Sequence, residues 1–236
     1  MRIRHKPPPG NVRRVVSTGK NIRGVITNKA GRLVQFESWA ERALLLRLER
    51  DRSVMDYGSQ PERFEYLDAQ GQRHTYTPDF IVWRVDNRVE IHEVTLEARR
   101  QRPEMQRREQ AALRICRERG WQYVIHTEQT LPQKTELANL LTLFRFRPHA
   151  YANEAVAAVV QAQLDSPLSC PLFTVLADTT KALGLPRATV AGALGHMLWH
   201  EQLLADLDQL LFVEGGPSVS AVVWLPVEVN NEALAR

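Results

Sequence analysis

The stretch YTPDFIVWRVDNRVEIHEVTLEARR, residues 76–100, contains two apolar runs separated by a polar turn. Residues 79–85 and 89–95 are rich in β-branched and aromatic side chains, which predicts two strands of an antiparallel hairpin. Asp79 opens the first strand, and Glu93 lies on the apolar face of the second, because side chains alternate along a strand. Burial of an unpaired carboxylate is costly, so both acids require an explanation.

The sequence around this hairpin predicts a compact α/β core. Residues 37–50 have the periodicity of an amphipathic helix, and Glu41 lies on its apolar stripe. Before the two strands, DAQGQRHTY predicts a hairpin that turns at Gly71. After them, residues 97–119 predict one long helix with eight Arg and four Glu, and WQYVIHT (121–127) predicts a buried strand. We expect this core to end near residue 148.

The acids on these elements suggest a metal site. Divalent cations such as Mg²⁺ bind several oxygen ligands, and carboxylates supply them in proteins. Hydrolysis of a phosphodiester uses such an ion to activate water and to neutralise charge on the phosphate. Glu41 on a helix, Asp79 at the start of one strand and Glu93 near the end of the next can meet at one point. Thr95 projects on the same side as Glu93.

Four motifs in this order carry a family resemblance: FESWAER (36–42), QPERFEY (60–66), YTPDFIV (76–82) and IHEVT (91–95). Together they resemble the nuclease domain of the TnsA-type endonuclease subunits of Tn7-like heteromeric transposases. That family belongs to the restriction-endonuclease-like superfamily, whose strand-borne acids form a D…(E/Q)-x-K motif. The resemblance covers roughly residues 22–148.

The resemblance implies a catalytic set of Glu41, Asp79, Glu93 and Thr95, of which the three acids bind Mg²⁺, with Mn²⁺ able to substitute. Thr95 departs from the family pattern, because it stands where the superfamily has a lysine. A threonine hydroxyl can position water but carries no positive charge. Arg99 or Arg100 could supply that charge instead, although arginine is a poor general base.

Basic residues are concentrated at the N-terminus. Residues 1–36 contain nine Lys and Arg and no acid, whereas the remaining 200 residues have a net charge of −5. A basic arm on an acidic body indicates contact with phosphates, although it could also be a solvated tail. The cations that we expect to contact DNA are Arg13, Arg14, Lys20, Arg23, Arg99 and Arg100. The arginines of 97–119 could instead form a solvated face held by pairs such as Glu104–Arg108.

The C-terminal region predicts three helices followed by short strands, the outline of a winged helix. We therefore expect a basic arm at 1–21, a restriction-endonuclease-like domain at 22–148 and a winged-helix-like domain at 149–236. The third helix, 186–200, has Arg187 as its one Lys or Arg, so it favours protein docking over base recognition. His196 and His200 have the spacing of zinc ligands but lack a third, which favours a packing role.

The resemblance implies a bacterial, cytoplasmic endonuclease subunit that cuts the 5′ non-transferred strands at transposon ends. Its implied partners are double-stranded DNA, a DDE-type transposase and an ATP-dependent transposition regulator. A non-catalytic or weakly catalytic subunit that binds DNA and the transposase is the alternative, and a winged-helix regulator is a third. The absence of a long apolar run indicates no membrane span, and two cysteines, Cys116 and Cys170, suit a reducing compartment.

Overall fold

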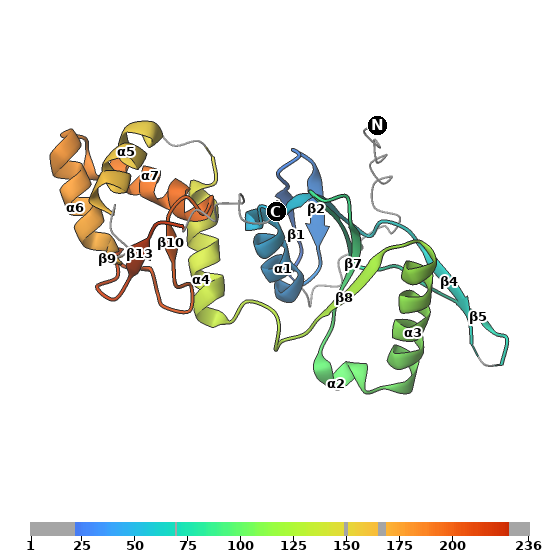
Figure 1. Cartoon of the computed structure of the whole chain (residues 1–236). Helices are drawn as coiled ribbons and strands as arrows, with labels where there is room; N and C mark the ends of the chain where they lie inside the picture. The colour runs from blue at the N-terminus through green and yellow to red at the C-terminus, as the bar shows by residue number, and fades with distance from the viewer. Residues whose placement is uncertain (1–21, 69, 149–150, 165–168, 227–236) are drawn as a thin grey trace, which may run out of the picture. The chain divides into compact units, whose positions relative to one another are not determined.

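The chain forms two compact units, Met1–Leu131 and Pro132–Arg236. The computed structural model describes residues 22–68, 70–148, 151–164 and 169–226 (Figure 1). The expected basic arm, 1–21, lies outside the described residues.

The boundary between the units precedes the expected one near residue 148, because α4 (Lys134–Leu143) and the 3₁₀ turn η1 (Phe144–Phe146) belong to the second unit. Asn139 of α4 shows why. Its side-chain amide donates hydrogen bonds to the carbonyls of Leu207 and Gln209 at 2.8 and 2.7 Å, and its oxygen accepts from the Leu211 N–H at 3.0 Å. A buried amide that is fully hydrogen-bonded fixes α4 against this later segment.

The first unit is built on a four-stranded mixed sheet of order β3-β6-β7-β8. The two strands predicted around the opening acids are β6 (Phe80–Arg84) and β7 (Val89–Val94), which pair antiparallel. β3 (Val54–Ser59) pairs antiparallel with β6, and β8 (Gln122–His126) runs parallel to β7. This mixed α/β architecture is consistent with the expected nuclease core.

Helices cover both faces of the sheet, α1 (Trp39–Arg50) on one side and α3 (Pro103–Glu118) on the other (Figure 1). The α3 face is an apolar cluster that includes Ile81, Ile91 and Ile115. On the α1 side, the Tyr57 hydroxyl donates to Glu49 at 2.7 Å. Alternate residues along β6 and β7 therefore face different helices, one set facing α3 and the other facing α1.

The helix predicted at 97–119 is broken in the structure. A short helix, α2 (Glu97–Arg100), ends before α3 begins at Pro103. Proline has no backbone N–H and disfavours helical geometry in the residue before it, so it is tolerated at the first position of a helix but not in its interior. The break separates Arg99 and Arg100 from the arginines of α3.

Two small hairpins complete the first unit. β4 (Phe64–Leu67) and β5 (Arg73–Tyr76) form the predicted hairpin, and Gly71 in its turn has a φ of +75°, which glycine adopts without strain. A second hairpin, β1 (Gly24–Thr27) and β2 (Leu33–Phe36), precedes α1 and was not predicted.

The second unit contains the predicted helices α5 (Asn153–Gln163), α6 (Leu172–Leu183) and α7 (Arg187–Trp199). Short strands form a sheet of order β10-β13-β9 and a two-stranded β11-β12 pair. Their bounds are β9 (Cys170–Pro171), β10 (Leu204–Ala205), β11 (Phe212–Val213), β12 (Gly216–Pro217) and β13 (Val222–Trp224). Within the described segments, no helix has the length and apolar character needed to span a bilayer.

Candidate active site

Asp79 and Glu93 lie beside each other at one end of the β6–β7 pair. The register pairs Phe80 with His92, and one further step places Asp79 opposite Glu93. Directly opposed residues of an antiparallel pair point to the same face, here the face that α3 covers. The Val94 N–H donates to Asp79 Oδ2 at 2.7 Å, which fixes the carboxylate at this position. The expectation that these two acids meet therefore agrees with the structure.

The electrostatic environment of this pair disfavours two free carboxylates. Burial raises the pKa of Asp79 well above its ordinary range, and the nearby charges of Glu93 and Glu41 raise it further. Burial also raises the pKa of Glu93, while Arg108 opposes the rise. Crowded acids with raised pKa values are typical of functional sites, because a bound cation removes the repulsion.

The charge of Glu41 raises the pKa values of both Asp79 and Glu93, but its carboxylate is hydrogen-bonded to neighbouring residues at the start of α1. Ser38 is the N-cap of α1, and its hydroxyl accepts the Glu41 N–H at 3.1 Å. Glu41 accepts hydrogen bonds from the Ser38 hydroxyl at 3.0 Å and from the Glu37 N–H at 2.7 Å. Ser38 and Glu41 thus have the S-x-x-E spacing of a capping box, with the reciprocal bond made to the N–H of Glu37, the residue before the cap.

Arg108 is the cation that sequence reasoning missed. It projects from α3, its guanidinium donates to Glu93 Oε1, and it lies over the Tyr76 ring at 5.0 Å from the centroid. Arg108 thus contacts the strand acid, and not Glu104 as in the alternative of a solvated face. The sequence carried a signal, because Arg108 precedes the buried Ala112 and Ile115 by four and seven residues and so lies on the inner stripe of α3.

Glu93 is 5% exposed, and its second oxygen, Oε2, is buried without a hydrogen-bond partner. An orphaned carboxylate oxygen is unusual in a folded protein, because polar atoms lose their water on burial. Together with Asp79 it forms an all-oxygen donor pair that suits a hard divalent ion. Across the described residues, no three His, Cys, Asp or Glu side chains are grouped closely enough to hold a metal ion. The two strand acids fit such an ion, and further ligands would have to come from water or substrate.

The other residues expected at the site have different surroundings. Thr95 is the residue after β7, where its N–H donates to the His126 carbonyl at 2.9 Å. Arg99 is exposed on α2. Arg100 is engaged by Glu97 and Glu109, the latter at 2.9 Å.

Among the cations expected to contact DNA in the N-terminal region, Arg23 is half-buried 4.0 Å from Glu37. Arg13, Arg14 and Lys20 lie outside the described residues. Arg23 and Arg100 therefore pair with acids other than the two strand acids.

A second polar cluster lies on the opposite face of β7. His92 Nε2 is 2.9 Å from Glu90, and His92 Nδ1 is 2.9 Å from His126 Nε2. Arg84 also pairs with Glu90 at 2.8 Å. Burial opposes ionisation of Glu90, but hydrogen bonds from His92 and Arg84 lower its pKa to about 2. Burial lowers the pKa values of both histidines, so this cluster is an anionic glutamate held by neutral imidazoles and one guanidinium.

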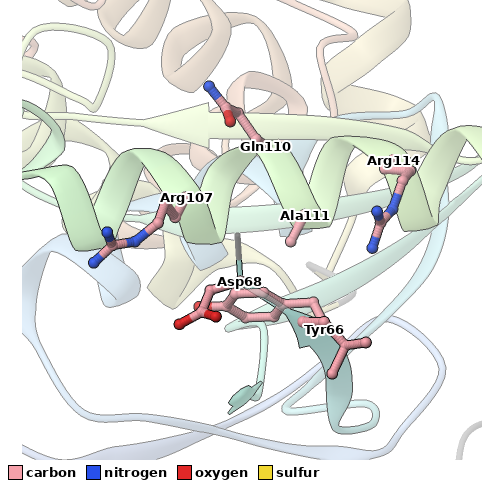
Figure 2. Close-up of a pocket in the computed structure, with 7 residues that line it drawn as sticks. Tyr66, Asp68, Arg107, Gln110, Ala111 and Arg114 are labelled. Carbon is pink, nitrogen blue, oxygen red and sulfur yellow. The ribbon is translucent and has the colours of Figure 1, made fainter. Parts of the chain in front are cut away.

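The outer surface of α3 forms one wall of a pocket of about 340 Å³. The opposite wall is the β4–β5 hairpin, with Tyr66 and Asp68 (Figure 2). Arg107 and Arg114 project from α3 toward these residues at either end of the pocket (Figure 2). The Asp68 carboxylate is 2.7 Å from His74, and Arg114 lies 3.9 Å from Glu118, so acidic and basic groups both line or flank the pocket.

His196 and His200 are hydrogen-bonded to backbone carbonyls of the same unit. His196 Nδ1 is 2.8 Å from the Pro148 carbonyl, and His200 Nε2 is 3.0 Å from the Arg147 carbonyl, which agrees with the packing role. Trp199 is 1% exposed and packs edge-on against Phe144, so the end of α7 belongs to the core. Cys116 and Cys170 are free thiols.

Comparison with known proteins agrees with the resemblance seen in the motifs. Residues 51–128 match the family model of the TnsA-like endonuclease N-terminal domain. The matched segment contains β6, β7, α3 and β8, and with them Asp79, Glu93 and Arg108, whereas Glu41 precedes it. A search of curated proteins gave no match.

Proposed function

We propose that this protein is the DNA-cleaving subunit of a Tn7-like transposase, cutting the 5′ non-transferred strands at the transposon ends, because residues 51–128 match the family model of the TnsA-like endonuclease N-terminal domain. The observation that carries the proposal is the placement of Asp79 opposite Glu93, with burial and mutual repulsion raising the pKa of Asp79. Two carboxylates kept in this state are expensive unless a cation binds them.

Asp79 and Glu93 are the residues that would hold Mg²⁺, or Mn²⁺ in its place. When bound, the ion supplies an activated water and neutralises charge on the phosphate. Asp79 is oriented for this role by the Val94 N–H, which occupies Oδ2 and leaves Oδ1 for a ligand. Glu41, at the start of α1, adds negative charge to the same site and would orient the attacking water or a second ion.

The alternative is a subunit that binds DNA and the transposase while cleaving weakly or not at all. Thr95 favours this reading, because it lacks the charge of the superfamily's lysine. Loss of one electrostatic contact to the reacting group costs on the order of 10²–10³ in rate.

The second unit would dock the protein partners, a DDE-type transposase and an ATP-dependent regulator. We propose that it is a winged-helix-like domain on the basis of three helices followed by short strands. Most of the apolar side chains of α7 are buried, and Arg187 is its one Lys or Arg, which leaves few donors for reading bases. The basic residues Arg13, Arg14 and Lys20 would contact the DNA backbone.

The decisive experiment measures cleavage of end-labelled transposon-end DNA by the full-length protein together with its transposase, in Mg²⁺. Asp79→Ala should abolish the 5′-strand cut, because one of the two strand acids is lost, while assembly on DNA persists. Asp86→Ala is the matched control, since Asp86 lies exposed in the turn of the same hairpin. Undiminished cutting by Asp79→Ala would disprove the metal-site assignment, and absence of cutting by the wild type would favour the non-catalytic alternative.

A further inference from the structure

A positive charge lies beside the two strand acids, but it is carried by Arg108 and not by residue 95, where the superfamily has a lysine. We propose that Arg108 is the phosphate-binding cation of this nuclease, contacting the scissile phosphate from α3 in place of the family's lysine. The inference rests on the proposed function and deepens it. Its observation is the contact between the Arg108 guanidinium and Glu93 Oε1, on the same carboxylate that faces Asp79.

The surroundings of Arg108 hold its charge at the site. The guanidinium is placed over the Tyr76 ring, 5.0 Å from its centroid, and the side chain remains 26% exposed. A stacked guanidinium keeps a defined orientation while part of it stays accessible. Of the two candidates suggested by sequence proximity, Arg100 is paired with Glu97 and Glu109, and Arg99 is exposed on α2.

The donors of Arg108 and the acceptors of Glu93 leave room for both a phosphate and a metal ion. A guanidinium has five N–H donors in a planar fork, so a contact with Glu93 leaves others for phosphate oxygens. Glu93 in turn has Oε1 engaged by Arg108 and Oε2 without a hydrogen-bond partner. Arginine stays protonated, so Arg108 would stabilise charge on the phosphate and would not act as a base.

A purely structural role for Arg108 makes different predictions. If the guanidinium only holds the Glu93 carboxylate in position, its removal should misplace that carboxylate and so weaken folding and metal binding together. If it binds the phosphate, its removal should lower cleavage while the metal-binding acids remain in place. Metal binding without DNA should then be retained or become tighter, because a competing cation has left Glu93.

The test compares wild type, Arg108→Gln, and Arg108→Gln combined with Thr95→Lys, all as full-length protein. Cleavage of transposon-end DNA is measured with the transposase present, and Mn²⁺ binding is measured without DNA by the free-ion signal in electron paramagnetic resonance. We expect Arg108→Gln to cut 10²–10³-fold more slowly and to bind Mn²⁺ at least as tightly as wild type. The added lysine should recover at least tenfold of the lost rate. Arg117→Gln, on an exposed position of the same helix, is the control for surface charge.

The outcomes separate this inference from the proposed function. If Asp79→Ala is inactive but Arg108→Gln cuts at the wild-type rate, Arg108 is not the phosphate-binding cation and the nuclease assignment stands. If Arg108→Gln loses Mn²⁺ binding and thermal stability together, and Thr95→Lys restores nothing, the role is structural and the inference is overturned. If Asp79→Ala cuts normally, the proposed active site itself is wrong.

Discussion

Replacing Asp79 with asparagine should stabilise the metal-free protein. The two strand acids are directly opposed, so their side chains start about 5 Å apart at the β-carbons. Two like charges at that distance repel by about 3 kcal/mol at an effective dielectric constant near 20. Arg108 offsets part of this repulsion, which leaves a net gain of about 1–2 kcal/mol for Asp79→Asn at a pH above the raised pKa of Asp79, where both acids are ionised. The asparagine carbonyl can still accept the Val94 N–H, so the backbone contact is kept.

The stability that Asp79→Asn gains over the wild type should increase as the pH rises. The folded-state pKa of Asp79 is raised above its unfolded value, so ionisation of Asp79 favours the unfolded chain. The wild type should therefore lose stability relative to Asp79→Asn as the pH rises from about 4 through the raised pKa. Added Mg²⁺ should reverse the order, because an ion at about 100 times its dissociation constant stabilises the wild type by about 2.7 kcal/mol.

Thermal or urea unfolding in EDTA, and then in Mg²⁺, measures both effects. The matched control is Asp51→Asn. Burial opposes ionisation of Asp51, but hydrogen bonds from Ser53 and Arg84 lower its pKa, so this substitution should destabilise the protein regardless of Mg²⁺. A loss of stability for Asp79→Asn in EDTA, or a Mg²⁺ response equal to that of the wild type, would refute the reasoning.

Two further predictions concern other parts of the first unit. Combined Arg107→Ala and Arg114→Ala should weaken DNA binding and reduce the salt slope by about 2, because each arginine at the pocket would contact one phosphate; an unchanged slope in a salt titration would exclude the pocket from the DNA surface. Glu90→Gln should cost about 2 kcal/mol or more at pH 7, since Arg84 and His92 lose a buried anion. The pKa of Glu90 is depressed to about 2, so its stabilisation is present above pH 5 and lost toward pH 2, and acid unfolding of Glu90→Gln should lack that dependence.

Local sequence patterns predicted the elements that carry the strand acids. The alternation in 79–85 and 89–95 predicted β6 and β7, and their short polar turn made an antiparallel pair the simple topology. That pairing alone places Asp79 near Glu93, because register follows from the turn. The prediction of a single helix at 97–119 was wrong, because Pro103 begins a new helix and is not tolerated in a helix interior.

Glu41 shows how a pattern can have two explanations. Its position on the apolar stripe and its place in FESWAER pointed to the site, and it does raise the pKa of Asp79. Its hydrogen bonds nevertheless belong to the cap of α1, which the S-x-x-E spacing also encodes. The sequence therefore predicted that Glu41 lies near the strand acids, but not that its carboxylate is hydrogen-bonded to Glu37 and Ser38.

The sequence by itself determined the two strand acids and the common face of Glu93 and Thr95, because side chains alternate along a strand. That residue 95 is a threonine where the superfamily pattern has a lysine is also read from the sequence alone. Only the tertiary structure decided which cation accompanies them. Arg108 is distant from Glu93 along the chain and reaches it because α3 packs its inner stripe on the sheet. Which helix residue contacts a strand depends on the rotation of the helix about its axis. The apolar periodicity shows which face of the helix is turned to the sheet, but it does not show which residue of that face contacts Glu93.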